Sequence, residues 1–449
     1  MRILFVLSNV TFFRYVDGIV RQLAAEGVNV VVWAKDQPNL AMQRCQQEFS
    51  NVSYGELPKA TYKLNRWLRS WRELRSYVHW LSPAYRCPQY LRTRWVSALP
   101  RQVRRIIRLL GLPRFEYIIS KMPWLESLLH RVERIVPCDK EIARAIRALA
   151  PDLVVGTPVI FPDSLELEHL KAAKQMEIPA IVLIASWDNL STKGTFHLEP
   201  DWVLVWNEIQ RREAATLHGI MPAKVIVTGA PVFDDWFSSH YRMSREEFCQ
   251  KAGLCPKLPY VVYLDSSPAS GDEKPMVSAL AQHFQEMGLF ERVQLLVRPH
   301  PKKAKKWDTM QPQHTVVWPQ DGKFVDVFET KQDYFNTLYH SFAAIGVNTS
   351  AFIEATILDR PCISITSEKH RYFQEQIIHF NYLLEAGFLY TAPNESACAS
   401  LVGDLLMGTD NKQAARKSFV SSFVRPIGTK KTSAQITTDF LKRVGNGRG

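Results

Sequence analysis

Residues 348–350 (Asn-Thr-Ser) form a small polar turn between an apolar run, residues 343–347, and a short helical run, residues 351–358. A helix that begins on small polar residues directly after a strand points unpaired backbone N–H groups above the sheet edge, which favours an anion such as a phosphate. Glu354 follows Ser350 by four residues, so both side chains share one helix face. A phosphate at the turn and a sugar hydroxyl at the carboxylate would then belong to one nucleotide; the alternative interpretation is a serine cap with a solvated glutamate. The predicted nucleotide ligands here are Asn348, Thr349, Ser350 and Glu354.

The tetrapeptide Arg-Pro-His-Pro at residues 298–301 also ends an apolar run. Its two prolines fix the backbone around His300 and prevent the strand from continuing, so the imidazole is held at the carboxyl edge of the sheet. Either His300 or Arg298 is therefore predicted to bind a phosphate, with a purely structural turn as the alternative. A further turn of small residues at 265–271 could approach a phosphate through backbone N–H groups. The donor-side predictions from these two segments are Ser266, Ser267, Arg298, His300 and Pro301.

In the first half of the chain, Ser-Trp-Asp-Asn at residues 186–189 follows the strongly apolar run of residues 180–185. Open α/β sheets place their chemistry at the carboxyl ends of parallel strands. Asp188 is therefore a candidate catalytic base for an acceptor hydroxyl. The alternative is that this aspartate and the asparagine after it only form an Asx turn.

Alternating apolar runs and amphipathic helices must position these segments. Residues 3–7 and 28–33 read as buried strands joined by a helix over 12–25, which opens a right-handed parallel α/β domain. The pattern restarts after Pro259, and 449 residues are too many for one core. We therefore predict an α/β protein with two Rossmann-like domains; a G-x-G-x-x-G fingerprint is missing from the first turn, which disfavours an NAD enzyme. The predicted parts are an N-terminal domain (1–228), a linker (229–258), a C-terminal domain (259–430), and a C-terminal helix and tail (431–449).

One segment carries the whole excess of positive charge. The net charge is +12, and residues 61–135 alone hold sixteen Lys or Arg against four acidic residues, so the rest of the chain is neutral. Arg-rich helices with interleaved tryptophans fit an anionic bilayer surface. The alternatives are a basic helical insertion that packs on its own domain and, less favoured because no nucleic-acid module is recognisable, a single-strand binder. The predicted membrane contacts are Arg66, Trp67, Arg69, Trp71, Arg72 and Arg75.

The seven cysteines are scattered and never form a CxxC pair, which is typical of reduced cytosolic cysteines and disfavours zinc or disulfide roles. Acidic residues show no cluster of the kind that binds magnesium, so no metal and no cofactor is predicted.

The order of these motifs resembles GT-B glycosyltransferases. Three groups of that superfamily show a similar order of motifs. In this chain the order is a strand, Arg-Pro-His-Pro, a helix, a strand, Gly-Val-Asn-Thr-Ser, a helix with glutamate, and Asp-Arg-Pro. The groups are the capsule-type 3-deoxy-manno-octulosonic acid transferases and sialyltransferases, the CDP-glycerol glycerophosphotransferases, and the UDP-N-acetylglucosamine 2-epimerases. The resemblance covers about residues 150–365, and the basic insertion has no counterpart in it. Neither the acidic motif of the sialyltransferases nor the His and carboxylate set of the epimerases is found, which ranks transfer above epimerisation.

The resemblance implies roles for the predicted residues. His300 and Pro301 would contact the nucleotide phosphate, the turn at 348–350 would bind phosphate, and Glu354 would hold the ribose. The Ser-Trp-Asp-Asn loop is similar to one in surface-carbohydrate biosynthesis proteins, which implies a role near the acceptor. The acceptor-side predictions from this loop are Trp187, Asn189 and Lys193. Ser8 and Asn9, which follow the first strand, are predicted on the acceptor side as well.

These expectations define one function. The chain is predicted to be a metal-independent glycosyltransferase, cytoplasmic and peripheral on the cytosolic face of the inner membrane. It would move a sugar from a CMP-, CDP-, UDP- or GDP-linked donor to a membrane-associated glycan or lipid-linked acceptor in capsule or lipopolysaccharide biosynthesis. The alternatives are a non-catalytic scaffold of a glycan-assembly complex, and a glycerophosphotransferase or nucleotide-sugar epimerase of the same superfamily.

Overall fold

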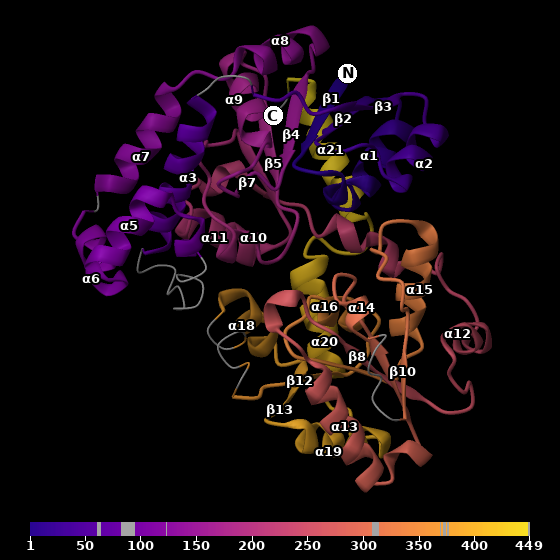
Figure 1. The fold of residues 1–449 in the computed structure, drawn as a ribbon. Coiled ribbons are helices and arrows are strands. Elements are labelled where there is room, and N and C mark those ends of the chain that lie inside the picture. Colours follow the sequence, from indigo (N-terminus) through magenta and orange to yellow (C-terminus); the bar gives the residue numbers. More distant parts are fainter. Residues whose placement is uncertain are drawn as a thin grey trace. The chain divides into compact units, whose positions relative to one another are not determined.

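The computed structural model describes residues 1–60, 64–81, 95–122, 124–307, 314–368, 370, 374 and 377–447. The chain forms two compact units (Figure 1). The first comprises Met1–Asp234 and Phe423–Gly449, and the second comprises Asp235–Ser422. The chain therefore leaves the first unit once and returns to it for its last helix.

The first unit is built on a parallel sheet of seven strands. Its strands are β1 (Arg2–Leu7), β2 (Asn29–Ala34), β3 (Val52–Glu56), β4 (Leu153–Thr157), β5 (Ala180–Leu183), β6 (Trp202–Val205) and β7 (Val225–Val227). Their order in the sheet is β3-β2-β1-β4-β5-β6-β7, and every pairing is parallel. The order reverses between β1 and β4, the kind of position where open α/β sheets bind ligands.

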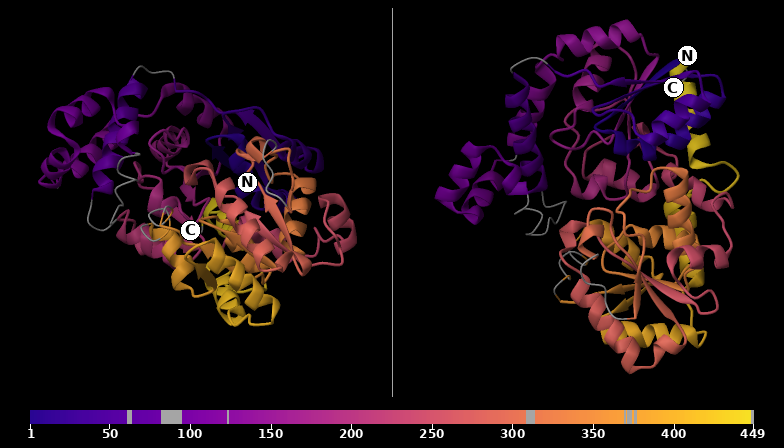
Figure 2. Two further views of the ribbon diagram at one scale, coloured as in Figure 1. Left: turned by 60° about the horizontal axis from the view of Figure 1, so that its bottom comes forward. Right: turned by 45° about the vertical axis from the view of Figure 1, so that its right-hand side comes forward.

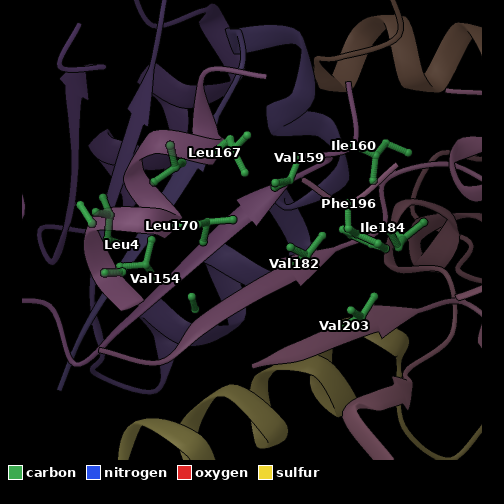
Figure 3. Close-up of a cluster of buried hydrophobic side chains, with 14 of the residues drawn as sticks. Leu4, Val154, Val159, Ile160, Leu167, Leu170, Val182, Ile184, Phe196 and Val203 are labelled. Carbon is green, nitrogen blue, oxygen red and sulfur yellow. The ribbon is translucent and has the colours of Figure 1, made fainter. Parts of the chain in front are cut away.

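Helices accompany this sheet. They are α1 (Asp17–Ala25), α2 (Leu40–Glu48), α8 (Lys140–Leu149), α9 (Glu166–Gln175), α10 (Asn189–Thr192), α11 (Glu208–Thr216) and the C-terminal α21 (Ser433–Gly445). Alternate residues of the central strands, such as Leu4, Val154 and Val182, point toward Leu167 and Leu170 of α9 (Figure 3). Helix α21 packs beside α1, as Figure 1 and the right-hand view of Figure 2 show. This helix therefore completes the first unit although it ends the chain.

The basic segment is helical. Its described helices are α3 (Leu64–Trp80), α5 (Arg101–Leu110), α6 (Leu112–Ser120) and α7 (Trp124–Ile135). The inner faces of α3, α5 and α6 share a small core formed by Tyr77, Leu99, Ile107 and Phe115. Within the described ranges, no helix is both long enough and apolar enough to cross a bilayer.

A buried ionic network joins this segment to the Rossmann-like part of the unit. Arg72 of α3 donates to both carboxylate oxygens of Glu133 on α7, at 2.8 and 2.7 Å, and also pairs with Glu168 of α9. Lys171 of α9 donates to Glu133 at 2.9 Å. All four side chains are buried. Because each charge has an opposite partner, the network can hold α3 and α7 against α9 without an isolated buried charge.

Two membrane predictions are corrected by this packing. Arg72 and Arg75 are both buried, and Arg75 donates to the carbonyl of Phe196 at 2.6 Å. Neither guanidinium can face lipid headgroups, because both hold the segment to its own unit. Arg69 is exposed and pairs with Glu73 at 3.1 Å. Trp67 is half exposed and Trp71 is partly buried, whereas the side chain of Arg66 lies outside the described part of the structure.

The second unit repeats the same sheet topology with six strands. They are β8 (Tyr260–Leu264), β9 (Gln294–Arg298), β10 (Thr315–Val317), β11 (Ala343–Gly346), β12 (Cys362–Ile365) and β13 (Leu389–Ala392), in the order β10-β9-β8-β11-β12-β13. All pairings are parallel. This confirms the prediction of an α/β protein with two Rossmann-like sheets.

The described helices of this unit are α12 (Arg245–Ala252), α13 (Lys274–Glu286), α14 (Ala304–Trp307), α15 (Phe328–Tyr339), α16 (Ala351–Ile357), α18 (Ile378–Glu385), α19 (Glu395–Leu406) and α20 (Gln413–Phe419). Helices α13 and α19 lie side by side (Figures 1 and 2), and their apolar residues share a core with alternate residues of the central strands. The strand order reverses between β8 and β11, which places the loops after these strands at a predicted ligand-binding position.

Candidate functional site

The predicted donor-side segments meet at one edge of the second sheet. In the register of the sheet, Leu264 pairs with Arg298 on one side and with Gly346 on the other. The loops that begin at 265, 299 and 347 therefore leave three adjacent strands at the same level. This brings the predicted Ser266, His300 and Ser350 segments to the reversal point of the strand order.

A buried charged cluster supports two of these loops. Lys303 is only 3% exposed; its ammonium pairs with Asp265, donates to the carbonyl of Ser266 at 3.1 Å and lies 3.8 Å from Glu273. Asp265 begins the loop after β8, whereas Lys303 belongs to the loop after β9. The ion pair therefore fixes one loop relative to the other, and a buried pair with further hydrogen bonds is costly to break.

Asp265 also determines how the His300 loop is held. Its Oδ2 accepts from the backbone N–H of His300 at 3.2 Å and from the indole N–H of Trp307 at 3.2 Å. Burial, followed by the nearby carboxylate of Glu273, raises the pKa of Asp265, and Lys303 opposes this rise. The His300 Nδ1 accepts from the backbone N–H of Lys302 at 3.1 Å. In the neutral imidazole the proton then resides on Nε2, which leaves that atom as a donor.

The sequence did not point to Lys303, Glu273 or Trp307. In the sequence, Lys303 is a lysine three residues after His300, and Glu273 is a carboxylate in the turn that follows Asp265. Neither position predicts burial, because charged residues in loops usually face water. Only the sheet register brings the two loops together. The predicted donor-side serines differ in exposure: Ser267 is exposed, and Ser266 is 2% exposed.

The hydroxyl of Ser266 is a buried polar group that lacks a hydrogen-bond partner among the described residues. Its backbone N–H donates to Glu273 at 3.3 Å, and Glu273 also accepts from Tyr263 at 2.8 Å. Buried hydroxyls in native proteins almost always have a partner from protein, water or ligand. The Ser266 hydroxyl is therefore ready to donate to a bound group.

Arg298 is buried at the end of β9. It donates to the hydroxyl of Thr337 at 3.0 Å and lies over the ring of Tyr334, 4.6 Å from its centroid. Burial lowers the pKa of Arg298 to about 10. Within the described part of the chain it forms no ion pair with a carboxylate; its direct contacts include the hydroxyl of Thr337 and the ring of Tyr334.

The turn at 348–350 precedes α16 as predicted. Ser350 is exposed and its side chain does not cap the helix; the backbone N–H of Ala351 is instead 3.3 Å from the hydroxyl of Thr349. The alternative interpretation of Ser350 as a capping serine is therefore wrong. Glu354 is half-buried on the same helix, and Pro301 and Asn348 are also half-buried.

A glutamine fixes the strand ends beside this turn. Buried Gln374 donates to the carbonyl of Val347 at 2.8 Å and to that of Ile365 at 2.9 Å. It therefore ties the ends of β11 and β12 together.

In the first unit, Asp188 lies in the turn after β5. Its carboxylate pairs with Lys193 at 2.8 Å, and its carbonyl accepts from the hydroxyl of Thr192 at 2.8 Å. Asn189 is buried and its Oδ1 accepts from two backbone N–H groups, at 3.1 and 3.0 Å, and Trp187 is buried as well. The Oδ1 of Asn189 is therefore engaged in the turn itself, and the prediction that Asn189 and Trp187 contact an acceptor stays a prediction. Asp188 and Lys193 remain partly exposed.

Ser8 and Asn9 directly follow β1 at the reversal point of the first sheet. The side chain of Asn9 accepts from the backbone N–H of Thr11 at 3.0 Å, and the backbone N–H of Ser8 donates to Glu166 at 3.1 Å. Glu166 is fully buried, and burial raises its pKa to about 7. Its Oε2 lacks a hydrogen-bond partner among the described residues. Sequence patterns missed Glu166, because a glutamate at the start of a helix usually faces water.

The arrangement in the second unit suits an anion. Donor groups of Arg298, Ser266 and His300 lie at the ends of adjacent strands, and the buried carboxylates of Asp265 and Glu273 accept hydrogen bonds from within the protein. In the described ranges, no group of three or more His, Cys, Asp or Glu side chains is placed to hold a metal ion.

Comparison with solved structures assigns the class of fold. Over 98% of this chain and all of the other, it is similar to the UDP-GlcNAc 2-epimerase from Methanocaldococcus jannaschii, with a TM-score of 0.55 and 12% identity. It is also similar to a glycosyltransferase from Rickettsia africae (TM-score 0.54, 12% identity, 99% and 98% covered) and to the UDP-GlcNAc 2-epimerase from Neisseria meningitidis bound to UDP-GlcNAc (0.54, 10%, 99% and 100%). The chain thus has the two-domain GT-B architecture.

No protein-family model matches the sequence, and no curated protein matches it. At identities of 10–12%, the structural likeness shows the fold, and the chemistry has to be argued from the residues of this chain.

Proposed function

We propose that this protein is a glycosyltransferase that moves a sugar from a nucleotide-sugar donor to a surface-glycan acceptor associated with the cytosolic face of a membrane. The observation that carries the proposal is the cluster of donor groups at the reversal point of the second sheet. Among the described residues, Arg298 brings a buried positive charge that forms no ion pair with a carboxylate. Ser266 brings a buried hydroxyl that has no hydrogen-bond partner there. A nucleotide phosphate satisfies both requirements.

The leaving nucleotide defines the chemistry at this edge. As the bond between the sugar and the phosphate breaks, negative charge grows on the phosphate oxygens. Arg298, the Nε2–H of His300 and the backbone N–H groups of the 348–350 turn would stabilise that charge, and each fixed donor of this kind typically contributes about 10²- to 10³-fold in rate. Glu354 would hold a ribose hydroxyl. Because these groups supply the positive potential themselves, the proposal needs no metal ion.

Asp188 is the proposed base for the acceptor hydroxyl. A positioned carboxylate of this kind contributes about 10²- to 10⁴-fold. Its ion pair with Lys193 holds the carboxylate in one orientation, and Lys193 is partly exposed and can move aside for an acceptor. Asp188→Asn should therefore lower kcat while leaving nucleotide affinity unchanged, which separates acceptor chemistry from donor binding.

Epimerisation of a nucleotide sugar is the second candidate, because the solved structures that share the fold include epimerases named for UDP-GlcNAc. Glycerophosphotransfer uses the same donor edge with a different group. A non-catalytic scaffold would bind no nucleotide sugar at all. The products distinguish these candidates: transfer releases the nucleotide and glycosylates an acceptor, whereas epimerisation returns an intact nucleotide sugar of altered configuration.

The first experiment is a binding screen with CMP, CDP, UDP and GDP, read by thermal shift and calorimetry. We expect one of them to raise the melting temperature, because a ligand at 100 times its Kd stabilises the native state by about 2.7 kcal/mol. His300→Ala should weaken that nucleotide by about tenfold or more, the value of one charge-assisted hydrogen bond.

A matched control is available in the same unit. His283 lies near the C-terminal end of α13, partly exposed and paired with Glu286 at 3.0 Å. His283→Ala should leave nucleotide affinity unchanged. If none of the four nucleotides binds, or if His300→Ala binds as tightly as the native protein, the proposed donor site is wrong.

A further inference from the structure

We propose that the outer face of α5 and α6 is a docking surface for bilayers rich in anionic phospholipids. This surface is distinct from the α3 arginines, of which Arg72 and Arg75 are buried. It lies on another pair of helices, at the side of the first unit farthest from its sheet (Figures 1 and 2).

The inner faces of both helices are already used. Ile107 of α5 and Phe115 of α6 are buried against Tyr77 and Leu99. Val103, Leu112 and Ile119 of the same helices pack against this core as well, so the packed faces of α5 and α6 are accounted for. Apolar side chains on their outer faces require another explanation, because large exposed apolar groups that cluster usually mark an interaction site.

Such a cluster is present. Ile106, Leu109 and Leu110 are spaced by three and four residues and form one stripe on α5; Leu109 is 85% exposed and Ile106 is 46% exposed. Tyr117 and Ile118 extend it on α6, with Tyr117 65% exposed. The stripe therefore lies outside the packed core of the segment.

A basic stripe runs beside the apolar one. Arg101, Arg105 and Arg108 are exposed and spaced by four and three residues, so they lie along one line of α5. None of the three forms an ion pair with a described residue. Glu116 is the only acidic residue between 95 and 122, and it accepts from the hydroxyl of Tyr77 at 3.0 Å. The positive charge of this face is therefore not neutralised by its own helices.

The paired stripes select the partner. A helix with an apolar flank and an arginine flank lies in the plane of a membrane interface, where the apolar flank meets acyl chains and the arginines meet anionic headgroups. Nucleic acid would match the arginines but leave Leu109 and Ile106 in water. An anionic bilayer satisfies both flanks, and the charge of the face gives it the preference for anionic over neutral lipid.

The proposal does not depend on the sugar chemistry of the other unit, so the two can fail separately. The test uses the full-length protein in flotation with phosphatidylcholine vesicles, with and without phosphatidylglycerol, at low salt. We expect binding to the anionic vesicles only. The triple variant Arg101→Gln, Arg105→Gln, Arg108→Gln should lower the partition coefficient by at least about tenfold, because each basic residue near anionic headgroups contributes to binding.

Helix α8 supplies a charge-matched control. Lys140, Arg144 and Arg147 are exposed on the same unit, and within α8 there is no large exposed apolar side chain. The triple variant Lys140→Gln, Arg144→Gln, Arg147→Gln removes the same charge and should change the partition coefficient by less than about threefold, since only long-range attraction is lost.

The apolar flank is tested by Leu109→Ser, which alters a side chain that touches little of the protein. We expect this variant to bind nucleotide normally and to bind anionic vesicles about threefold or more weakly, because burial of a leucine side chain is lost. The proposal is overturned if anionic vesicles are not bound, or if the α8 variant loses as much binding as the α5 variant. It is also overturned if single-stranded RNA is bound more tightly than the vesicles and Leu109→Ser has no effect on either.

Discussion

Replacing Glu166 with glutamine should make the first unit more stable at pH 8 and not at pH 5. Glu166 is fully buried at the reversal point of the first sheet, where its Oε1 accepts from Ser8 and its Oε2 has no described partner. Burial raises its pKa from about 4.5 to about 7. The folded state therefore keeps a proton that the unfolded chain releases between these two values.

The sign follows from proton linkage. Between pH 4.5 and 7 the folded state binds more protons than the unfolded chain, so the free energy of unfolding falls as pH rises, and the full cost is present above pH 7. The two values differ by 2.5 pKa units, which corresponds to about 3 kcal/mol at pH 8. Glutamine removes this cost but leaves an amide without a partner, which costs about 1 kcal/mol. The expected net gain is about 2 kcal/mol at pH 8, with no gain at pH 5.

Hydrogen exchange of the β1 and β4 amides as a function of urea measures this free energy for the first unit alone, which matters because a two-unit chain need not unfold in one step. Glu208, exposed on α11 of the same unit, is the matched control. Glu208→Gln should change the free energy of unfolding by less than about 0.5 kcal/mol at either pH. A gain for Glu166→Gln that is equal at both pH values, or a loss that is larger at pH 8, would refute the reasoning.

Two further predictions concern the first unit. Arg72→Met should lower the free energy of unfolding by about 3–5 kcal/mol in urea titrations, because buried Glu168 loses the guanidinium it pairs with and buried Glu133 keeps only Lys171. Arg69→Met on the exposed side of the same helix should cost less than about 1 kcal/mol, and equal costs for the two variants would contradict the buried network. Gly194→Ala should destabilise the Asp188 loop, because φ of Gly194 is +155° and an added Cβ would lie 2.1 Å from the carbonyl oxygen of Ile160. Gly219→Ala, also at positive φ but with open space around the added Cβ, should cost only about 1 kcal/mol. Thermal melting of the two variants compares these costs, and a smaller loss for Gly194→Ala than for Gly219→Ala would contradict the geometry.

The central strands could be predicted from the sequence, because strands covered on both faces read as continuous apolar runs. Edge strands carry a weaker signal. Strand β13 (Leu-Tyr-Thr-Ala) contains no continuous apolar run, and its two middle residues are not buried. Strand β3 (Val-Ser-Tyr-Gly-Glu) is likewise a partly exposed edge strand, and its sequence contains no apolar run that would predict it. Short strands with one neighbour are specified by the sheet that they join more than by their own residues.

The basic segment illustrates a different limit. Helical spacing identified its arginines but could not say which of them face water, because the partners are distant in sequence. Arg72 meets Glu133 and Glu168, which are 61 and 96 residues away. Without knowing that α7 and α9 pack on α3, an arginine buried in an ion pair and one that faces lipid give the same pattern. The stripe on α5 could be recognised only after the inner face of that helix was accounted for.

At the donor edge, the sequence indicated the loops, and the structure explains how carboxylates beside them are compatible with a phosphate. The two oxygens of Asp265 accept from an ammonium, an indole and a backbone N–H, and those of Glu273 accept from two hydroxyls and a backbone N–H. All of these acceptors are therefore engaged within the protein. Among the described residues, two donor groups at the same edge lack an acceptor of this kind: the buried hydroxyl of Ser266 has no hydrogen-bond partner, and the buried guanidinium of Arg298 forms no ion pair with a carboxylate. Since a buried donor without a partner is costly, the loops are stabilised most by a ligand that offers acceptors, which is the chemistry of a nucleotide phosphate.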